Sequence, residues 1–254
     1  MMRYADFKRL KAELLDNGIL DLSCHFVGDR NLYDADGHRE LASIWPVISR
    51  DPDVRVVLLR GHAGMFNGGG TPEMISDCVS SWDRVIEAHQ EARDIVMGVV
   101  ECTKPVVTAI EGAAVGGGLA AAMVSDITVA GDNAKIVDPH TLIGLVAGDG
   151  AAIIWPLLCG MARTKLALLT GQRIKGREAA AMGLVSMAVP DGEVLAKARE
   201  IAQSIAVQPH AAIRWTKHAL NGWLRMATPI FDHSLALEYV TMMGDDFREK
   251  MNIH

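Results

Sequence analysis

The chain has 254 residues, of which 50% are hydrophobic and 22% are charged. This composition is typical of a folded globular protein, and the length fits one large domain or two of about 150 residues or less. The formal net charge of −6 gives no electrostatic reason to bind nucleic acid, because phosphate binding needs clustered Lys and Arg side chains.

No segment resembles an export signal or a membrane span. The N-terminal stretch MMRYADFKRLKAELL mixes charged and apolar residues, and the most apolar stretch, residues 151–162, is interrupted by Pro156 and Gly160. A span needs about 20 apolar residues, so we expect no membrane association. The four cysteines form no C-x-x-C pair, which predicts buried thiols in a cytoplasmic protein.

Predicted strands and helices alternate up to residue 190. Apolar patterns predict strands at 18–26, where the pattern is half-buried, and at 54–59, 105–110, 126–130 and 184–189. A helix at 34–50, a long amphipathic stretch at 72–101 and a short helix after the third strand separate the first four of them. Because parallel strands need crossover connections, this order predicts an α/β fold.

The remainder of the chain has helical periodicity and no convincing strand, notably at 193–205 and 211–226. We therefore expect a core of residues 1–190 followed by a helical region of residues 191–254. The apolar faces of this region, which include Met242 and Met243, need a partner surface on the main body or on another subunit.

Two glycine-rich turns follow predicted strands, GMFNGGG at 64–70 and GAAVGGGLAAA at 112–122. Open α/β sheets bind ligands at the carboxyl ends of their strands. Gly117 opens a helix, where the N–H groups lack intrahelical acceptors. Together with Gly68 it could form an oxyanion hole, in which one donor contributes about 3 kcal/mol. The alternative is that these glycines only permit tight turns and close packing.

These segments resemble the crotonase superfamily, the enoyl-CoA hydratase/isomerase family. The resemblance is carried, in order, by VRVVLLRG, MFNGGG, KPVVTAIEGAAVGGGLAAAMVSDITVAGDNAKI, GLVAGDG and LLTGQRIKGREAAAMGLVSMAVP. It implies a spiral of repeated ββα units whose C-terminal helices close the pocket and assemble a homotrimer or a dimer of trimers. It also implies an acyl-CoA thioester substrate, with no cofactor beyond the CoA of that substrate.

The resemblance places the oxyanion hole at Gly68 and Gly117. Five further residues of the two turns are then expected to line the site of the CoA substrate: Phe66, Asn67, Gly69, Gly70 and Gly116. The remaining histidines, including His38, show no metal-ligand spacing. We therefore expect no metal site, and solvated or locally hydrogen-bonded roles for those histidines.

The proton-transfer residues depart from the family pattern. The two positions at which the family's hydratases carry glutamates hold Ala120 and His140 in this chain. We expect His140 to transfer protons and Asp149 to orient it, since a carboxylate can fix an imidazole's tautomer. The alternatives are that Asp149 caps the helix that begins near Gly150 and that His140 is only hydrogen-bonded.

The spacing of His140, Gly148-Asp149-Gly150 and Trp155-Pro156 is similar to that of the camphor-dione C–C hydrolases of the superfamily, although the glycine turn at 116–118 is intact here. The leading hypothesis is an enoyl-CoA hydratase/isomerase-like enzyme that acts through an enolate. The alternatives are a double-bond isomerase, a β-diketone C–C hydrolase, and a non-catalytic acyl-CoA-binding or assembly protein.

Overall fold

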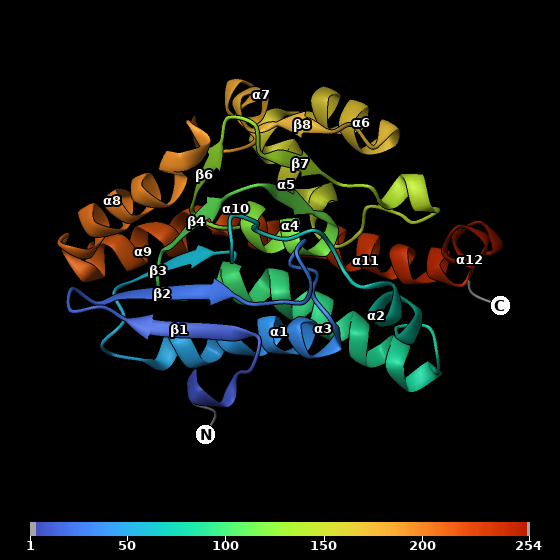
Figure 1. Ribbon diagram of the computed structural model, residues 1–254, viewed down its shortest axis with the longest axis horizontal. Helices are drawn as coiled ribbons and strands as arrows, with labels where there is room; N and C mark the ends of the chain where they lie inside the picture. The colour runs from blue at the N-terminus through green and yellow to red at the C-terminus, as the bar shows by residue number, and fades with distance from the viewer. Residues whose placement is uncertain (1–3, 253–254) are drawn as a thin grey trace.

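The computed structural model describes residues 4–252 and contains two β-sheets enclosed by helices (Figure 1). The larger sheet has the spatial order β1 (Leu10–Leu14), β2 (Ile19–Cys24), β3 (Val56–Arg60), β4 (Val106–Ile110), β6 (Ile127–Gly131) and β9 (Met187–Val189). The smaller sheet has the order β5 (Ala113–Val115), β7 (Lys135–Val137) and β8 (Ile174–Lys175). The predicted α/β fold is confirmed.

Strands β2, β3, β4, β6 and β9 run parallel, whereas β1 is antiparallel to β2 and β8 is antiparallel to β7. The prediction that β2 is half-buried was wrong, because all six of its residues are buried. Its polar side chains are tolerated inside because they have partners. The Asp21 carboxylate pairs with Arg60 at 2.7 Å and with Arg199 at 3.3 Å.

Helices cover both faces of the larger sheet. The helices before residue 190 are α1 (Ala35–Arg50), α2 (Pro72–Asp77), α3 (Trp82–Glu101), α4 (Gly116–Met123), α5 (Ala151–Cys159), α6 (Met161–Thr170) and α7 (Gly176–Met182). The long stretch at 72–101 is thus two helices, each capped at its start by a hydroxyl, that of Thr71 or Ser81. Short 3-10 turns lie at η1 (Tyr4–Asp6), η2 (His140–Ile143) and η3 (Asp191–Glu193).

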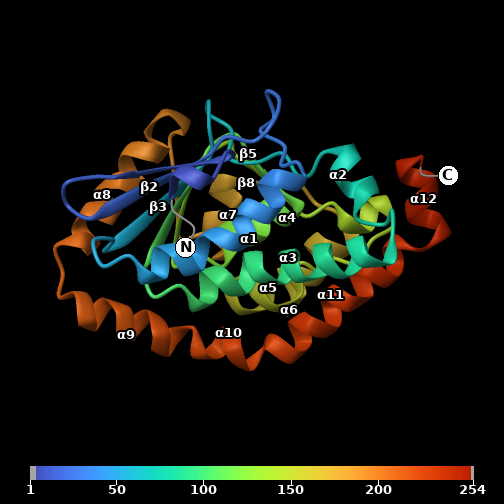
Figure 2. The same ribbon diagram turned by 90° about the horizontal axis from the view of Figure 1, so that it is seen from below.

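The C-terminal region is helical, as expected: α8 (Val194–Ala206), α9 (His210–Leu220), α10 (Gly222–Met226), α11 (Thr228–Met242) and α12 (Asp245–Met251). Helix α8 packs an alanine-rich face against β3, β4 and β6. From α9 onward the chain runs along the opposite side of the molecule (Figure 2), where α11 contacts α3 and α5. These helices therefore complete the body of the subunit.

A buried lysine attaches α9 to the end of α3. Lys217 Nζ donates to the carbonyl oxygens of Val99 and Lys104 at 3.2 and 2.9 Å, and it lies 2.8 Å from the carboxylate of Asp126. The cation thus satisfies carbonyl groups around the C-terminus of α3, where positive charge is favourable. This contact holds α9 against the end of α3.

Within residues 4–252, no helix is both long and apolar enough to cross a membrane. Several large apolar side chains nevertheless remain exposed on the C-terminal helices, including Trp223, Met226 and Ile230. Met243 is exposed as well, whereas Met242 is buried. The apolar faces of the C-terminal helices are therefore only partly buried against the rest of the chain, and the remainder is exposed.

Candidate active site

The two glycine-rich turns lie in direct contact. The Phe66 N–H donates to the Glu111 carbonyl at 2.8 Å, and the Asn67 N–H donates to the Ala113 carbonyl at 2.9 Å. The first turn therefore runs alongside β5, the short strand within the second turn that leads directly into α4. A Cβ at Gly118 would overlap the Asn67 side chain, so this close approach requires glycine.

Gly68 and Gly117 line one cavity of about 290 Å³, together with Gly69, Gly70 and Gly116. Gly117 is the second residue of α4, so its N–H lies in the first turn and has no intrahelical acceptor. The cavity is near the lower end of the range for small-molecule sites. The structure thus brings both predicted carbonyl-binding glycines to one site.

Phe66 and Asn67 lie behind this cavity, and their side chains do not line it. Phe66 is part of the hydrophobic core. The Asn67 side chain accepts from the Gly69 N–H at 2.7 Å and donates to the Asn31 carbonyl at 3.0 Å. These two side chains therefore shape the first turn. They do not line the cavity, although the sequence predicted that both residues would line the substrate site.

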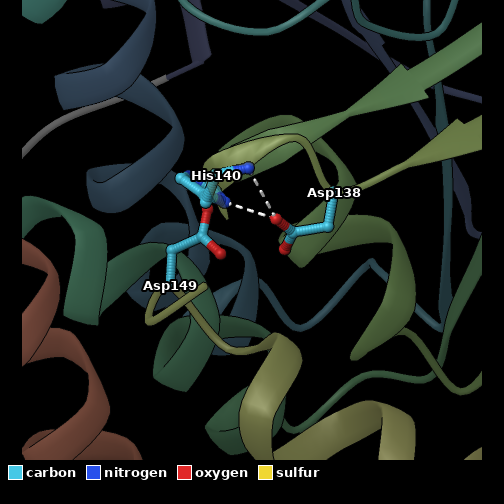
Figure 3. A group of neighbouring side chains, drawn as sticks. All are labelled: Asp138, His140 and Asp149. Carbon is cyan, nitrogen blue, oxygen red and sulfur yellow. Dashed lines mark hydrogen bonds and ion pairs between the residues drawn. The ribbon is translucent and has the colours of Figure 1, made fainter. Parts of the chain in front are cut away.

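His140 begins the η2 turn after β7, and its ring is fixed by Asp138. The Nδ1 atom of His140 lies 2.6 Å from Asp138 Oδ1, which also accepts the His140 backbone N–H at 3.2 Å (Figure 3). We expected Asp149 to orient the imidazole, but the hydrogen-bonded carboxylate is Asp138. The reason is local, since an aspartate side chain readily bonds a backbone N–H two residues later.

Two further carboxyl groups flank the opposite ring nitrogen. His140 Nε2 lies 3.7 Å from Asp149 Oδ2 and 3.7 Å from Glu238 Oε1. Both distances are too long for direct hydrogen bonds, and a water or substrate atom could bridge them. Asp149 does not cap α5, whose N-cap is Gly150 with no side-chain hydrogen bond. Asp149 and Glu238 instead line the cavity.

Asp149 also adjoins the second glycine turn. A Cβ built on Gly117 would lie 3.3 Å from Asp149 Oδ2, and one built on Gly116 would lie 3.8 Å from His140 Cε1. The cavity therefore has one side made of glycine backbone and another side made of the titratable side chains of His140, Asp149 and Glu238.

A family model described as Enoyl-CoA hydratase/isomerase matches residues 27–252. The chain belongs to this family. It is 31% identical over 215 residues to a probable mitochondrial enoyl-CoA hydratase 2 of Arabidopsis thaliana. The matched region covers 81% of this chain and 68% of the relative. The resemblance seen in the sequence is thereby confirmed.

Solved structures agree with this assignment. An enoyl-CoA hydratase/isomerase from Mycobacterium paratuberculosis superposes with a TM-score of 0.91 at 30% identity, covering 96% of this chain and 97% of that one. A β-diketone hydrolase from Anabaena sp. PCC 7120, solved with (S)-3-oxocyclohexyl acetic acid, gives 0.87 at 29% identity, covering 94% and 96%. Because similar chains perform different reactions, the reaction must be argued from the site.

The buried carboxyl groups of this enoyl-CoA hydratase/isomerase family member have unequal proton affinities. Burial raises the pKa of Asp149 to about 6 and of Glu238 to about 8, although the charge on His140 opposes both shifts. Asp138 behaves differently. Burial raises its pKa, but the charge and hydrogen bonds of His140 outweigh that effect and lower it.

The imidazole is favoured in its charged form. Burial lowers the pKa of His140, but the three carboxyl groups of Asp138, Asp149 and Glu238 outweigh burial and raise it well above its ordinary value. The carboxyl groups thus favour the imidazolium form of His140, whose Nε2–H points toward Asp149 and Glu238. In that form the ring can donate a proton but cannot accept one.

Asp138, His140 and Asp149 also have donor atoms within 4.8 Å of one another, close enough to hold a metal ion. The short Nδ1–Oδ1 contact between His140 and Asp138 is explained by a shared proton, which a cation on those atoms would displace. The expectation that this family member needs no metal stays a prediction.

Glu238, Tyr33 and the orienting role of Asp138 were not predicted from the sequence. Glu238 comes from α11, and its position in the apolar run SLALEYVTMM was a signal, since a lone acidic residue there must be buried or paired. His38 was expected to be solvated or locally hydrogen-bonded, but it is buried, bonds Glu91 on another helix at 2.7 Å and lines the cavity. Tyr33 gave no sequence signal.

Proposed function

We propose that this chain is an enzyme that generates and protonates the enolate of an acyl-CoA thioester, as an enoyl-CoA hydratase or isomerase does. The observation that carries the proposal is the pairing of two carboxyl groups of different pKa, Asp149 and Glu238, with a cavity lined by Gly68 and Gly117. One carboxyl is mostly ionised at neutral pH and the other mostly protonated, which is the arrangement that acid–base catalysis requires.

The thioester oxygen is held by the N–H groups of Gly68 and Gly117. The start of α4 adds the positive end of its helix dipole beside that oxygen. Negative charge develops there when the enolate forms, so the two donors stabilise the transition state more than the substrate. Each donor is expected to contribute about 3 kcal/mol.

Asp149 acts as the base and Glu238 as the acid. A carboxylate with a pKa of about 6 is a stronger base than an ordinary aspartate, yet it is still largely ionised at pH 7. Glu238, with a pKa of about 8, retains a proton to give to the enolate carbon. In hydration, Asp149 takes a proton from water as its oxygen attacks the β-carbon, and Glu238 protonates the α-carbon.

His140 takes a different role from the one that the sequence suggested. As an imidazolium held by Asp138, it stabilises ionised Asp149 and keeps its Nε2–H directed at the reacting groups. In isomerisation, Asp149 removes a proton from one carbon of the substrate, and the carboxyl group thus formed on Asp149 returns that proton to another carbon, which leaves the site as it began.

The test is a panel of 2-enoyl-CoA and 3-enoyl-CoA thioesters, followed by mass spectrometry and NMR. Hydration adds the mass of one water with CoA still attached, whereas isomerisation leaves the mass unchanged and moves the double bond. Asp149→Asn should abolish either reaction, whereas Asp83→Asn, on the exposed first turn of α3, should not. Tight acyl-CoA binding without any turnover would instead support the non-catalytic alternative.

A second candidate is hydrolytic cleavage of a β-diketone. The 3.7 Å separations of His140 Nε2 from Asp149 and from Glu238 suit a water held among the three groups. The similarity to the Anabaena β-diketone hydrolase supports this candidate. Asp149 would remove a proton as the water attacks one carbonyl, and the C–C bond would then break to leave an enolate at the second carbonyl.

The same mass measurement separates the two candidates. A cyclic β-diketone that gains one water and opens to a keto acid supports hydrolysis, while conversion confined to CoA thioesters supports the leading proposal. We also propose a homotrimer or a dimer of trimers, supported by the exposed apolar side chains of the C-terminal helices. Light scattering coupled to size exclusion measures that state directly.

A further inference from the structure

Tyr33 places a phenolic hydroxyl at the carbonyl-binding glycines. Its ring is buried and lines the cavity. A Cβ built on Gly117 would overlap the Tyr33 hydroxyl oxygen, so that oxygen lies against the Gly117 backbone. Tyr33 follows β2 in the chain and is therefore far in sequence from the turn that its hydroxyl reaches.

The backbone of Tyr33 is fixed to the other glycine turn. Its N–H donates to the Gly69 carbonyl at 3.1 Å, and its own carbonyl accepts the Thr71 N–H at 2.9 Å. One residue thus joins both turns, since its main chain binds the turn of Gly68 while its hydroxyl adjoins Gly117. Any carbonyl oxygen bound between these glycines lies close to that hydroxyl.

The ring is held in place by aromatic neighbours. Tyr33 stacks on the His38 ring with centroids 5.6 Å apart, and it meets the Phe26 ring edge-on at 6.0 Å. His38 is itself fixed by its 2.7 Å contact with Glu91. A donor fixed before substrate binds needs no reorganisation during the reaction, which is what makes such donors effective.

No hydrogen bond of the Tyr33 hydroxyl to protein is found within residues 4–252, and its oxygen is not among the fully buried side-chain atoms that lack a partner. The oxygen is therefore open to the cavity, where a ligand atom can reach it. Burial and the nearby Asp149 charge raise the pKa of Tyr33 well above its ordinary value, so the proton stays on the oxygen. A protonated and unpaired hydroxyl in a ligand cavity is available to donate to a bound ligand.

We propose that the Tyr33 hydroxyl is a third hydrogen-bond donor to the substrate carbonyl oxygen, beside the N–H groups of Gly68 and Gly117. This inference rests on the proposed function. It adds a side-chain donor to the carbonyl site, and it gives the negative oxygen of the enolate a neutral donor on the side facing Asp149.

Tyr33→Phe tests the inference because it removes the hydroxyl and keeps the ring. We expect kcat to fall by about 10- to 100-fold, with a smaller change in KM, because the enolate oxygen needs the donor more than the substrate does. Tyr4→Phe is the matched control, since it removes a hydroxyl that donates to Asp51 away from the cavity. It should leave kcat unchanged.

Infrared spectroscopy of a bound saturated acyl-CoA, labelled with ¹³C at the thioester carbonyl, gives an independent measurement. Wild-type protein should lower the carbonyl stretching frequency, and Tyr33→Phe should return part of that shift. If kcat and frequency in Tyr33→Phe equal those of wild type while the wild type shifts the carbonyl, Tyr33 is not a donor and the proposed function stands. If wild type neither turns over nor shifts the carbonyl, both proposals fail.

Discussion

The imidazole Nδ1 of His140 lies 2.6 Å from the carboxylate of Asp138, two residues earlier in the chain. This contact fixes which ring nitrogen faces the cavity, because Nδ1 is occupied and Nε2 is directed at Asp149 and Glu238. Asp138 also contributes to the raised pKa of His140. The orientation of the imidazole therefore depends on this buried side chain, and its charge depends on Asp138 together with Asp149 and Glu238.

Asp138→Asn keeps the shape of this contact and removes its charge. We expect the pKa of His140 to fall, so that the ring loses its proton at a lower pH than in wild type, and kcat to fall by about 100-fold. NMR titration of the His140 ring nitrogens measures the pKa shift directly. An unchanged titration would show that Asp138 has only a structural role.

The rate of reaction should depend on pH through Asp149 and Glu238. With pKa values of about 6 and 8, activity requires the first group to be ionised and the second to be protonated. We expect kcat/KM to fall below pH 6 as Asp149 gains a proton, and to fall above pH 8 as Glu238 loses one. The maximum then lies between these two values.

Glu238→Gln identifies the alkaline limb of this profile. The variant should be slower and should lose the decline above pH 8, because glutamine does not titrate. Glu200→Gln, on the exposed face of α8, should keep the full profile. A decline above pH 8 that persists in Glu238→Gln would assign that limb to another group.

Gly117 should tolerate no side chain. In Gly117→Ala the new Cβ would overlap the Tyr33 hydroxyl and approach Asp149, so we expect kcat/KM to fall at least about 100-fold and thermal stability to decrease. Adding Tyr33→Phe removes the overlapping oxygen and should restore stability but not activity. Gly222→Ala, where a Cβ meets nothing within 4 Å, is the control.

Rescue of both stability and activity by Tyr33→Phe would contradict this expectation. It would mean that the added alanine side chain lowers activity only through its overlap with the Tyr33 hydroxyl, because alanine keeps the backbone N–H at this position. Thermal denaturation and steady-state kinetics on the same four proteins decide between the two outcomes.

The sequence was sufficient for the fold because long elements carry periodic patterns. Strands β3, β4 and β6 and helix α1 lie within a few residues of their predicted ranges. Strands β5, β7 and β8 have two or three residues each, which is too short to show alternation. The β1 strand was missed because most of its residues are at least partly exposed.

Only those residues of the candidate site that stand in a local sequence motif could be predicted. Gly68, Gly117, His140 and Asp149 each stand in a local motif, and the structure gathers them at one cavity. Glu238 is distant in sequence from all of them and reaches the cavity because α11 crosses α3 and α5. The apolar run around Glu238 marks it as buried or paired, but its placement at this cavity depends on tertiary packing and could not be predicted from that local pattern.

The buried Lys217 attaches α9 to the end of α3. Lys217→Met should lower the free energy of unfolding by about 3 kcal/mol, because the variant leaves Asp126 and two carbonyl groups without their buried partner. Lys197→Met, which removes an exposed pair with Glu200, should cost less than about 1 kcal/mol. Urea denaturation measures both. At temperatures well below unfolding, kcat of Lys217→Met should match wild type, since Lys217 does not reach the cavity. A large loss of kcat in folded protein would show that α9 also positions Glu238 through α11.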